Sequence, residues 1–186
     1  MSRTLPPTPG QTVGPFFGYA LPYDGAPVLV PKDRADAIRL HGRVLDGAGD
    51  PVPDALLELW QADADGVISQ QAGSWKRDGS SFTGWGRSAT DPEGRYSFST
   101  VTPGPTVPGG AAYFGLTVFA RGLLHRLFTR VYVPGDDALL AADPLLSSVP
   151  ADRRATLVAA PDETGYVFDV RLQGDGETVF LSYPRD

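Results

Sequence analysis

The chain has 186 residues, of which 41% are hydrophobic and 20% charged, a composition typical of a folded domain. Its net charge of −6 disfavours nucleic-acid binding, because phosphate backbones repel an acidic surface. The absence of cysteine excludes disulfides, iron–sulfur clusters and a thiol nucleophile. No stretch approaches ~18 consecutive apolar residues, and the N-terminus lacks the apolar core of a signal peptide, so we expect a soluble, cytoplasmic protein.

Residues 1–36 have the composition of an extended arm. Seven prolines recur in this segment and disfavour helix, because each one lacks a backbone N–H donor. The same segment carries Phe16, Phe17, Tyr19 and Tyr23, which are too apolar for a free tail. Such an arm lies over another surface, either its own domain or a partner. We predict that the arm packs on a partner subunit, and that residues 37–186 form a separate core.

Residues 37–186 read as short strands separated by Gly and Pro turns. Apolar and polar residues alternate at period two from Ile38 to Val44, which is typical of a half-buried strand. The predicted strands cover residues 38–44, 55–60, 82–89, 95–101, 113–120, 124–133, 166–172 and 178–183. The one helical candidate covers residues 136–158. The chain is therefore predicted to be mainly β, an antiparallel β-sandwich with a Pro-rich N-terminal arm and one short helical excursion.

The residues that usually carry chemistry are sparse. The two histidines, His41 and His125, are isolated in the sequence, and an isolated histidine is more often structural than a ligand. The sequence contains no His-x-His, no His-Glu-x-x-His and no Gly-x-Ser-x-Gly. By its own residues the chain is poorly equipped for catalysis.

Four motifs nevertheless occur in an order that resembles the intradiol ring-cleavage dioxygenases. They are Thr8-Pro9-Gly10-Gln11-Thr12-Val13-Gly14-Pro15-Phe16-Phe17, then Gly42-x-Val44-x-Asp46 continuing through Glu58-x-Trp60-Gln61-Ala62-Asp63-x-x-Gly66, then Asp91-x-x-Gly94-x-Tyr96-x-Phe98-x-Thr100-Val101-x-Pro103-Gly104, and finally Tyr166-x-Phe168-Asp169 through Phe180. The resemblance spans nearly the whole chain and implies the β-sandwich of that family. The last motif resembles one branch in particular, the iron-free alpha subunits of heteromeric members.

The positions that bind iron in the family are changed in this chain. The resemblance implies ferric iron held by two Tyr and two His, the latter as a His-x-His pair on a strand. Tyr113 and Gly115 stand in the places of the two His, and Thr106 stands in the place of one Tyr. The other Tyr is also missing, since no Tyr occurs between Gly66 and Tyr96. The resemblance therefore implies that this chain binds no metal, and that Fe(III) belongs to a partner beta subunit.

The resemblance also implies a set of residues that complete the partner's active site. Thr12, Gly14, Pro15 and Phe16 would form part of the pocket wall. Arg121 would reach toward the substrate, where a guanidinium can orient and neutralise a benzoate carboxylate. Two plainer readings stay open: Gly14-Pro15 as a simple turn, and Arg121 as the partner of an interface carboxylate.

The implied activity is intradiol cleavage of protocatechuate by O2 to 3-carboxy-cis,cis-muconate, in the beta-ketoadipate pathway of aromatic catabolism. The chain would act within an obligate heteromer with an iron-bearing beta subunit, and would be inactive alone. The alternative is a non-catalytic, transthyretin-like β-sandwich binding module, because a fold does not fix a function. A self-sufficient dioxygenase with unusual ligands is disfavoured by Thr106, Tyr113 and Gly115.

Overall fold

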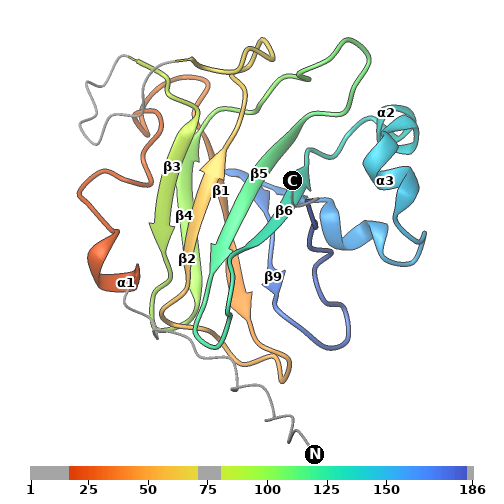
Figure 1. The fold of residues 1–186 in the computed structure, drawn as a ribbon. Coiled ribbons are helices and arrows are strands. Elements are labelled where there is room, and N and C mark those ends of the chain that lie inside the picture. The colour runs from red at the N-terminus through yellow and green to blue at the C-terminus, as the bar shows by residue number, and fades with distance from the viewer. Residues whose placement is uncertain (1–16, 71–80, 184–186) are drawn as a thin grey trace, which may run out of the picture.

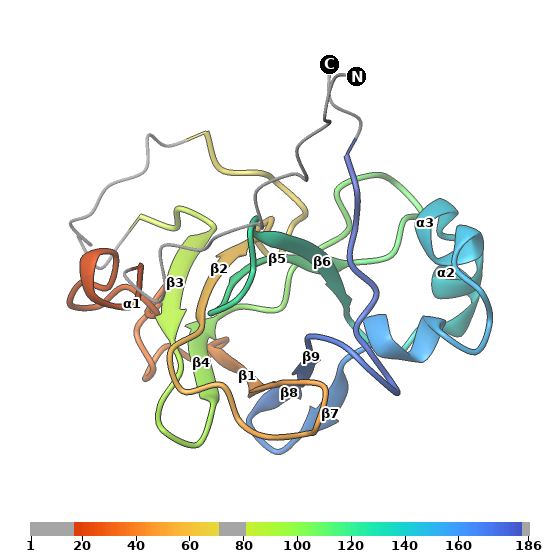
Figure 2. The ribbon, with the colours of Figure 1, turned by 60° about the horizontal axis from the view of Figure 1, so that its bottom comes forward.

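The computed structural model describes residues 17–70 and 81–183, which form two β-sheets with short helices on opposite sides (Figure 1). The first sheet has the order β4-β1-β8-β7, with β9 also paired to β1, and the second has the order β3-β2-β5-β6. A second view shows the sheets as two layers (Figure 2). Within the described residues, no helix combines the length and the apolar character needed to cross a bilayer. The predicted β-sandwich is confirmed.

The strands largely follow the predicted positions. The first sheet consists of β1 (Ile38–Leu45), β4 (Arg95–Thr100), β7 (Ala160–Asp162), β8 (Gly165–Val167) and β9 (Val170–Arg171). The second consists of β2 (Leu56–Trp60), β3 (Trp85–Ala89), β5 (Tyr113–Phe119) and β6 (Leu127–Tyr132). All the strand pairs are antiparallel except those of β1 with β8 and β9.

The core lies between the sheets and follows the period of two. On β1, Leu40 and Val44 are fully buried, whereas Arg39 and Arg43, which directly precede them, are exposed. The inward residues of the other strands close the same core, and each fully buried aliphatic or aromatic side chain contributes about 1.5–3 kcal/mol. The largest inward side chains are Tyr96, Phe98, Leu57, Leu59, Phe114, Leu116 and Val118. The pattern leaves both outer faces available for binding or assembly.

The helical excursion is confirmed and consists of three short pieces, α2 (Asp137–Ala142), α3 (Pro144–Ser148) and the 3-10 turn η1 (Arg154–Leu157). Asp136 caps α2, where its side chain accepts a hydrogen bond from the backbone of the first turn. Asp143 ends α2 and caps α3, accepting from two backbone N–H groups at 2.9 and 3.0 Å. Two successive caps explain why the segment breaks instead of forming one long helix.

Two local predictions were wrong. No strand forms at 178–183: a single bridge joins Leu181 to Phe128. Thr178 instead exchanges hydrogen bonds with the Arg171 backbone, accepting on its hydroxyl and donating from its N–H. The Pro-rich arm was predicted to contain no helix, but α1 (Phe17–Ala20) forms one turn. That turn lies between two prolines in the sequence, at a spacing that leaves room for four helical residues.

The described part of the arm, residues 17–36, packs on its own domain. Ala26, Leu29 and Val30 are buried. The backbone N–H of Leu29 donates to Ser99 on β4 at 2.8 Å, and Ser99 donates back to Pro27 at 2.9 Å. The arm therefore extends the edge of the first sheet before the core begins. Packing of the arm on a partner subunit stays a prediction.

Candidate functional site

Tyr113 and Gly115, which the resemblance places where two histidine ligands would fall, lie on the outer face of β5. The ladder places Gly115 between Trp60 on β2 and Arg130 on β6. A side-chain Cβ built at Gly115 would lie 3.4 Å from the Trp60 carbonyl oxygen, which is ordinary contact. Packing therefore permits a side chain at this position. The glycine nonetheless offers no donor atom to a metal.

The positively charged side chain of Arg130 lies next to Tyr113 and opposite Gly115. The Arg130 guanidinium lies over the Tyr113 ring, with its central carbon 4.0 Å from the ring centroid. It also donates to the Tyr132 hydroxyl at 3.3 Å, and Tyr132 in turn donates to Asp143 at 2.8 Å. Burial raises the pKa of Tyr132 above its ordinary value, so this hydroxyl keeps its proton. The strand end thus carries a fixed positive charge.

These residues do not fit a ferric ion. Gly115 has no side-chain ligand, and the positive charge of Arg130 lies against Tyr113, the neighbouring ligand position. Thr106 is exposed in the loop between β4 and β5. A neutral hydroxyl is a weak ligand for Fe(III) compared with a tyrosine phenolate. We therefore derive no chemistry for this chain through a metal of its own.

Gln61 maintains the framework around the missing site. Its side-chain amide donates to the Val101 carbonyl at 3.0 Å and accepts from the Thr100 hydroxyl at 2.5 Å. Thr100 is the last residue of β4, and Val101 begins the loop from β4 to β5. The buried Gln61 amide therefore connects the end of β2 to the start of this loop. Buried polar groups need such partners, which explains why the residue type is required here.

A close backbone contact holds the turn that precedes Thr106. Gly66 has φ +82°, and a Cβ built on it would lie 2.1 Å from the Pro105 carbonyl oxygen. Gly104 donates its backbone N–H to the Asp63 carbonyl at 2.7 Å. These two contacts hold the turn in place against residues 63–66. Thr106, which follows the turn, has a hydroxyl where the resemblance predicts a tyrosine ligand.

Arg121, the candidate substrate-orienting residue, lies just beyond the other end of β5. Its Nε lies 2.9 Å from each carboxylate oxygen of Asp54, and its Nη2 also donates to Oδ2. This hydrogen bonding raises the pKa of Arg121 above its ordinary value. The Arg121 side chain is 61% exposed and that of Asp54 18%. A carboxylate on its own chain thus orients a guanidinium that still faces solvent.

The register of the ladder explains the pairing of Arg121 with Asp54. Leu56 lies opposite Phe119 in the antiparallel pair of β2 and β5, so two residues further out Asp54 lies opposite Arg121. Sequence analysis missed Asp54, because its role depends on which strands pair and in which register. The only available signal was the charge complementarity of two residues flanking predicted strands.

The described start of the arm lies at the same end of β5. The Phe17 ring centroid is 6.0 Å from that of Phe119, and α1 lies beside the lower ends of β2 and β3 in Figure 1. The four predicted pocket residues of the arm lie outside the described residues: Thr12, Gly14, Pro15 and Phe16. Their role stays a prediction, but the chain continues directly from Phe16 into this contact. The arm thus leaves the described fold near Arg121.

The two ends of β5 are well separated. The seven residues of extended strand from Tyr113 to Phe119 span roughly 20 Å. Arg121 therefore belongs to a different place on the surface from the changed ligand positions.

Other polar groups of the two sheets have structural partners. Arg87 on β3 donates to the Glu58 carboxylate at 2.5 Å and to the Leu21 carbonyl of the arm at 2.8 Å. His41 lies outward on β1, as its sequence pattern predicts, and is 2.7 Å from Asp162 on β7. Asp162 therefore gives His41 a structural partner, which agrees with the expectation that an isolated histidine is more often structural than a ligand.

Known proteins resemble this chain over most of its length. A family profile described as Dioxygenase matches residues 12–174. A protocatechuate 3,4-dioxygenase alpha chain from Burkholderia cepacia is 42% identical, and the match covers 96% of this chain and 98% of that one. The beta chain of the same name and organism is 35% identical, covering 77% of this chain and 67% of that one.

Solved structures agree on the fold. The dioxygenase domain of a dioxygenase and carbohydrate-binding fusion protein from Streptomyces sp. SirexAA-E superposes with a TM-score of 0.54 at 23% identity, covering 91% of this chain and 99% of that one. The sequence motifs, the sandwich and the full-length relatives lead to one conclusion. The chain belongs to the intradiol dioxygenase family.

Proposed function

We propose that this chain is the alpha subunit of a protocatechuate 3,4-dioxygenase, a subunit that binds no iron and completes the active site of an iron-bearing beta subunit. The observation that carries the proposal is the contrast between the two ends of β5. At one end Gly115 has no donor atom and lies opposite Arg130, whose guanidinium covers Tyr113. Just beyond the other end, Arg121 is exposed and is oriented by Asp54. The full-length similarity to an alpha chain supports it.

A related beta chain is the partner in this proposal. The beta chain from Burkholderia cepacia is 35% identical to this chain, so the two subunits would be homologous sandwiches. In this arrangement Fe(III) belongs to the beta subunit, where it would supply the activation of substrate and O2. The overall reaction is intradiol cleavage of protocatechuate to 3-carboxy-cis,cis-muconate.

The roles of this chain's residues follow from charge and shape. Arg121 would bind the carboxylate of protocatechuate, because a guanidinium provides paired donors for a carboxylate. Asp54 would act as a positioning residue that keeps this guanidinium in one orientation. Thr12, Gly14, Pro15 and Phe16 of the arm would form the pocket wall and exclude water from the substrate.

The deciding experiment compares the chain alone with the chain co-expressed beside a candidate beta subunit. Metal content and oxygen uptake on protocatechuate are measured for both samples. We expect iron and turnover only in the co-purified complex. Iron and turnover in the isolated chain would refute the iron-free assignment. Failure of the two chains to associate, with activity in neither sample, would favour the binding module instead.

A further inference from the structure

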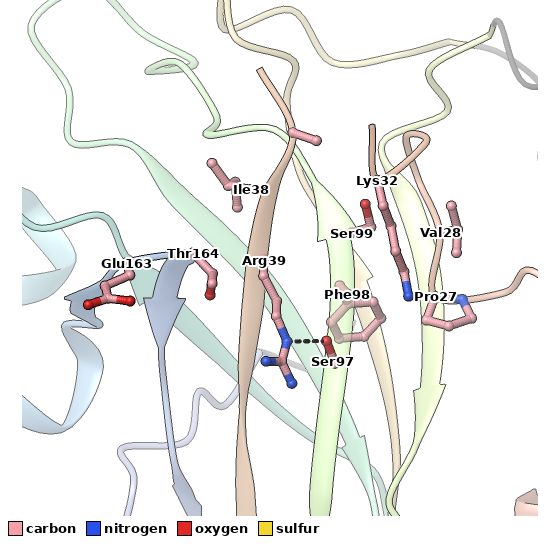
Figure 3. A pocket seen from close by; sticks show the side chains of 11 residues that line it. Pro27, Val28, Lys32, Ile38, Arg39, Ser97, Phe98, Ser99, Glu163 and Thr164 are labelled. Carbon is pink, nitrogen blue, oxygen red and sulfur yellow. Dashed lines mark hydrogen bonds between the residues drawn. The ribbon is translucent and has the colours of Figure 1, made fainter. Parts of the chain in front are cut away.

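A hollow of about 740 Å³ lies on the outer face of the first sheet, where the arm joins β4 and β1 (Figure 3). Its size falls within the ordinary range for small-molecule pockets. The polar side chains that line it are Lys32, Arg39, Ser97, Ser99, Glu163 and Thr164. Since these come from the arm, β1, β4 and the turn between β7 and β8, the hollow exists only when the arm is joined to the sheet.

Two cations dominate the polar lining. Among residues 17–70 and 81–183, neither Lys32 nor Arg39 forms an ion pair. Arg39 is held by one hydrogen bond, from its Nε to the Ser97 hydroxyl at 2.8 Å, so its terminal nitrogens stay available. In Figure 3 the ends of both side chains point in the same direction. A chain with a net charge of −6 thus presents unpaired positive charge at this hollow.

Neighbouring charged groups add to the positive charge of Lys32 and Arg39 or offset it. An adjoining hollow of about 470 Å³ shares Arg39 and adds Arg43 and Asp169. Arg95 also lines it, but its guanidinium is paired with Asp91 and Glu93 and adds little to the field. Glu163 is the one carboxylate in the lining of the first hollow. The local balance favours a bound anion, but the presence of Glu163 makes a multiply charged anion less suitable than a singly charged one.

The rest of the lining indicates the shape of the ligand. Pro27 and Val28 provide apolar surface at the hollow, whereas the Ile38 side chain packs against the core. Ser99 already donates its hydroxyl to the Val30 carbonyl at 2.8 Å, so it supports the wall more than it binds. An inorganic anion would leave the apolar surface wet, whereas an apolar body would cover it.

We infer that this hollow is a binding site for a small carboxylic acid with an apolar or aromatic body. The carboxylate lies between the Lys32 ammonium and the Arg39 guanidinium, and the body lies on Pro27 and Val28. Ser97 positions Arg39 by accepting its Nε hydrogen. The inference does not depend on the proposed function, because no residue of the proposed substrate pocket takes part.

The probe is radiolabelled benzoate, measured by equilibrium dialysis against the full chain. We expect one saturable site, and an affinity that falls about tenfold in Arg39→Ala, since a charge-assisted hydrogen bond is lost. Lys32→Ala should lose less, and Glu163→Gln should bind about twofold more tightly because a repulsive charge is removed. Arg126→Ala is the matched control, an exposed arginine beside Phe128 on the second sheet, and should bind as the unchanged chain does.

Three results would overturn the inference: no saturable binding, equal losses in Arg39→Ala and Arg126→Ala, or inorganic phosphate competing as strongly as benzoate. Thermal melting checks that each variant is folded. If the chain is obtained only with its partner, the difference between the unchanged complex and the Arg39→Ala complex isolates this site, because any binding at the partner's iron contributes equally to both.

Discussion

The two ends of β5 differ in what they retain. At the start of the strand, the ligand positions hold Tyr113 and Gly115, and the Arg130 guanidinium lies 4.0 Å from the Tyr113 ring. Just beyond its end, Arg121 is paired with Asp54 and remains 61% exposed. The residues at one end do not fit a metal ion, whereas the other end presents an oriented cation beside the start of the arm. This difference supports the proposal that the end of the strand near Arg121 serves a site of the partner subunit.

The comparison separates the motif residues that hold the backbone in place from the positions where metal ligands are predicted. Gln61, Gly66 and Gly104 belong to the motifs that identify the family, and all three build the connection from β2 to the loop before β5. None of them is a metal ligand. These motif residues thus support the sandwich, whereas Thr106, Tyr113 and Gly115 stand at the positions where the resemblance predicts metal ligands.

The largest effect should come from disturbing this support. In Gly66→Ala the new Cβ would lie 2.1 Å from the Pro105 carbonyl oxygen, at a φ of +82°. We expect a loss of at least about 3 kcal/mol in the free energy of unfolding, from backbone strain and the clash together. Urea denaturation of the full chain measures it.

Gly109→Ala is the matched control for this prediction. Its φ is +71°, but nothing lies within 4 Å of the built Cβ. We expect a loss of only about 1 kcal/mol, from the backbone conformation alone. Equal losses in the two variants would show that the contact between Gly66 and Pro105 does not hold the turn.

The second prediction concerns the opposite end of β5. In the assembled enzyme, Arg121→Ala should raise KM for protocatechuate about tenfold with a smaller effect on assembly, since one charge-assisted carboxylate contact is lost. Asp54→Asn should raise KM less, because the guanidinium stays but is less firmly oriented. Steady-state kinetics and gel filtration measure both effects. Unchanged kinetics in Arg121→Ala would show that the pair is structural.

Most of the fold could be predicted from the sequence, but the partners within the site could not. Period-two patterns indicated the strands of both sheets, because burial alone imposes that pattern. The pairing of Asp54 with Arg121 depends on the register of β2 against β5, which local patterns do not contain. Arg130 likewise gains its meaning only from its position opposite Gly115.

A smaller effect is expected at the His41–Asp162 pair, which is the internal reference for Arg121–Asp54 because no substrate is expected there. The hydrogen bond from His41 lowers the pKa of Asp162 from 3.8 to about 2. Because the carboxyl pKa is lower in the folded state, Asp162 stabilises the fold when the pH is above its ordinary pKa. This contribution is lost as the pH falls through the pKa of the folded state. The stability difference between the unchanged chain and Asp162→Asn should therefore hold above pH ~4 and vanish near pH ~2.

Urea midpoints at several pH values test the His41–Asp162 prediction, and KM for protocatechuate should not change in Asp162→Asn. A stability difference that persists undiminished at pH ~2 would show that the charge of Asp162 is irrelevant to it. A change in KM as large as that of Arg121→Ala would remove the distinction between the two pairs.

The smallest effect is expected where the sequence change is most conspicuous. Restoring both imidazoles in Tyr113→His with Gly115→His should leave the chain folded, since a Cβ at Gly115 makes only ordinary contact. We expect no stoichiometric ferric iron by metal analysis, and no visible tyrosinate absorption, because both tyrosine ligands remain absent and Arg130 keeps a positive charge nearby. Adding Arg130→Gln removes that charge and serves as the control. One iron per chain in the double variant would contradict the prediction, because it would mean that two histidines suffice and that the cation opposite Gly115 does not oppose the metal.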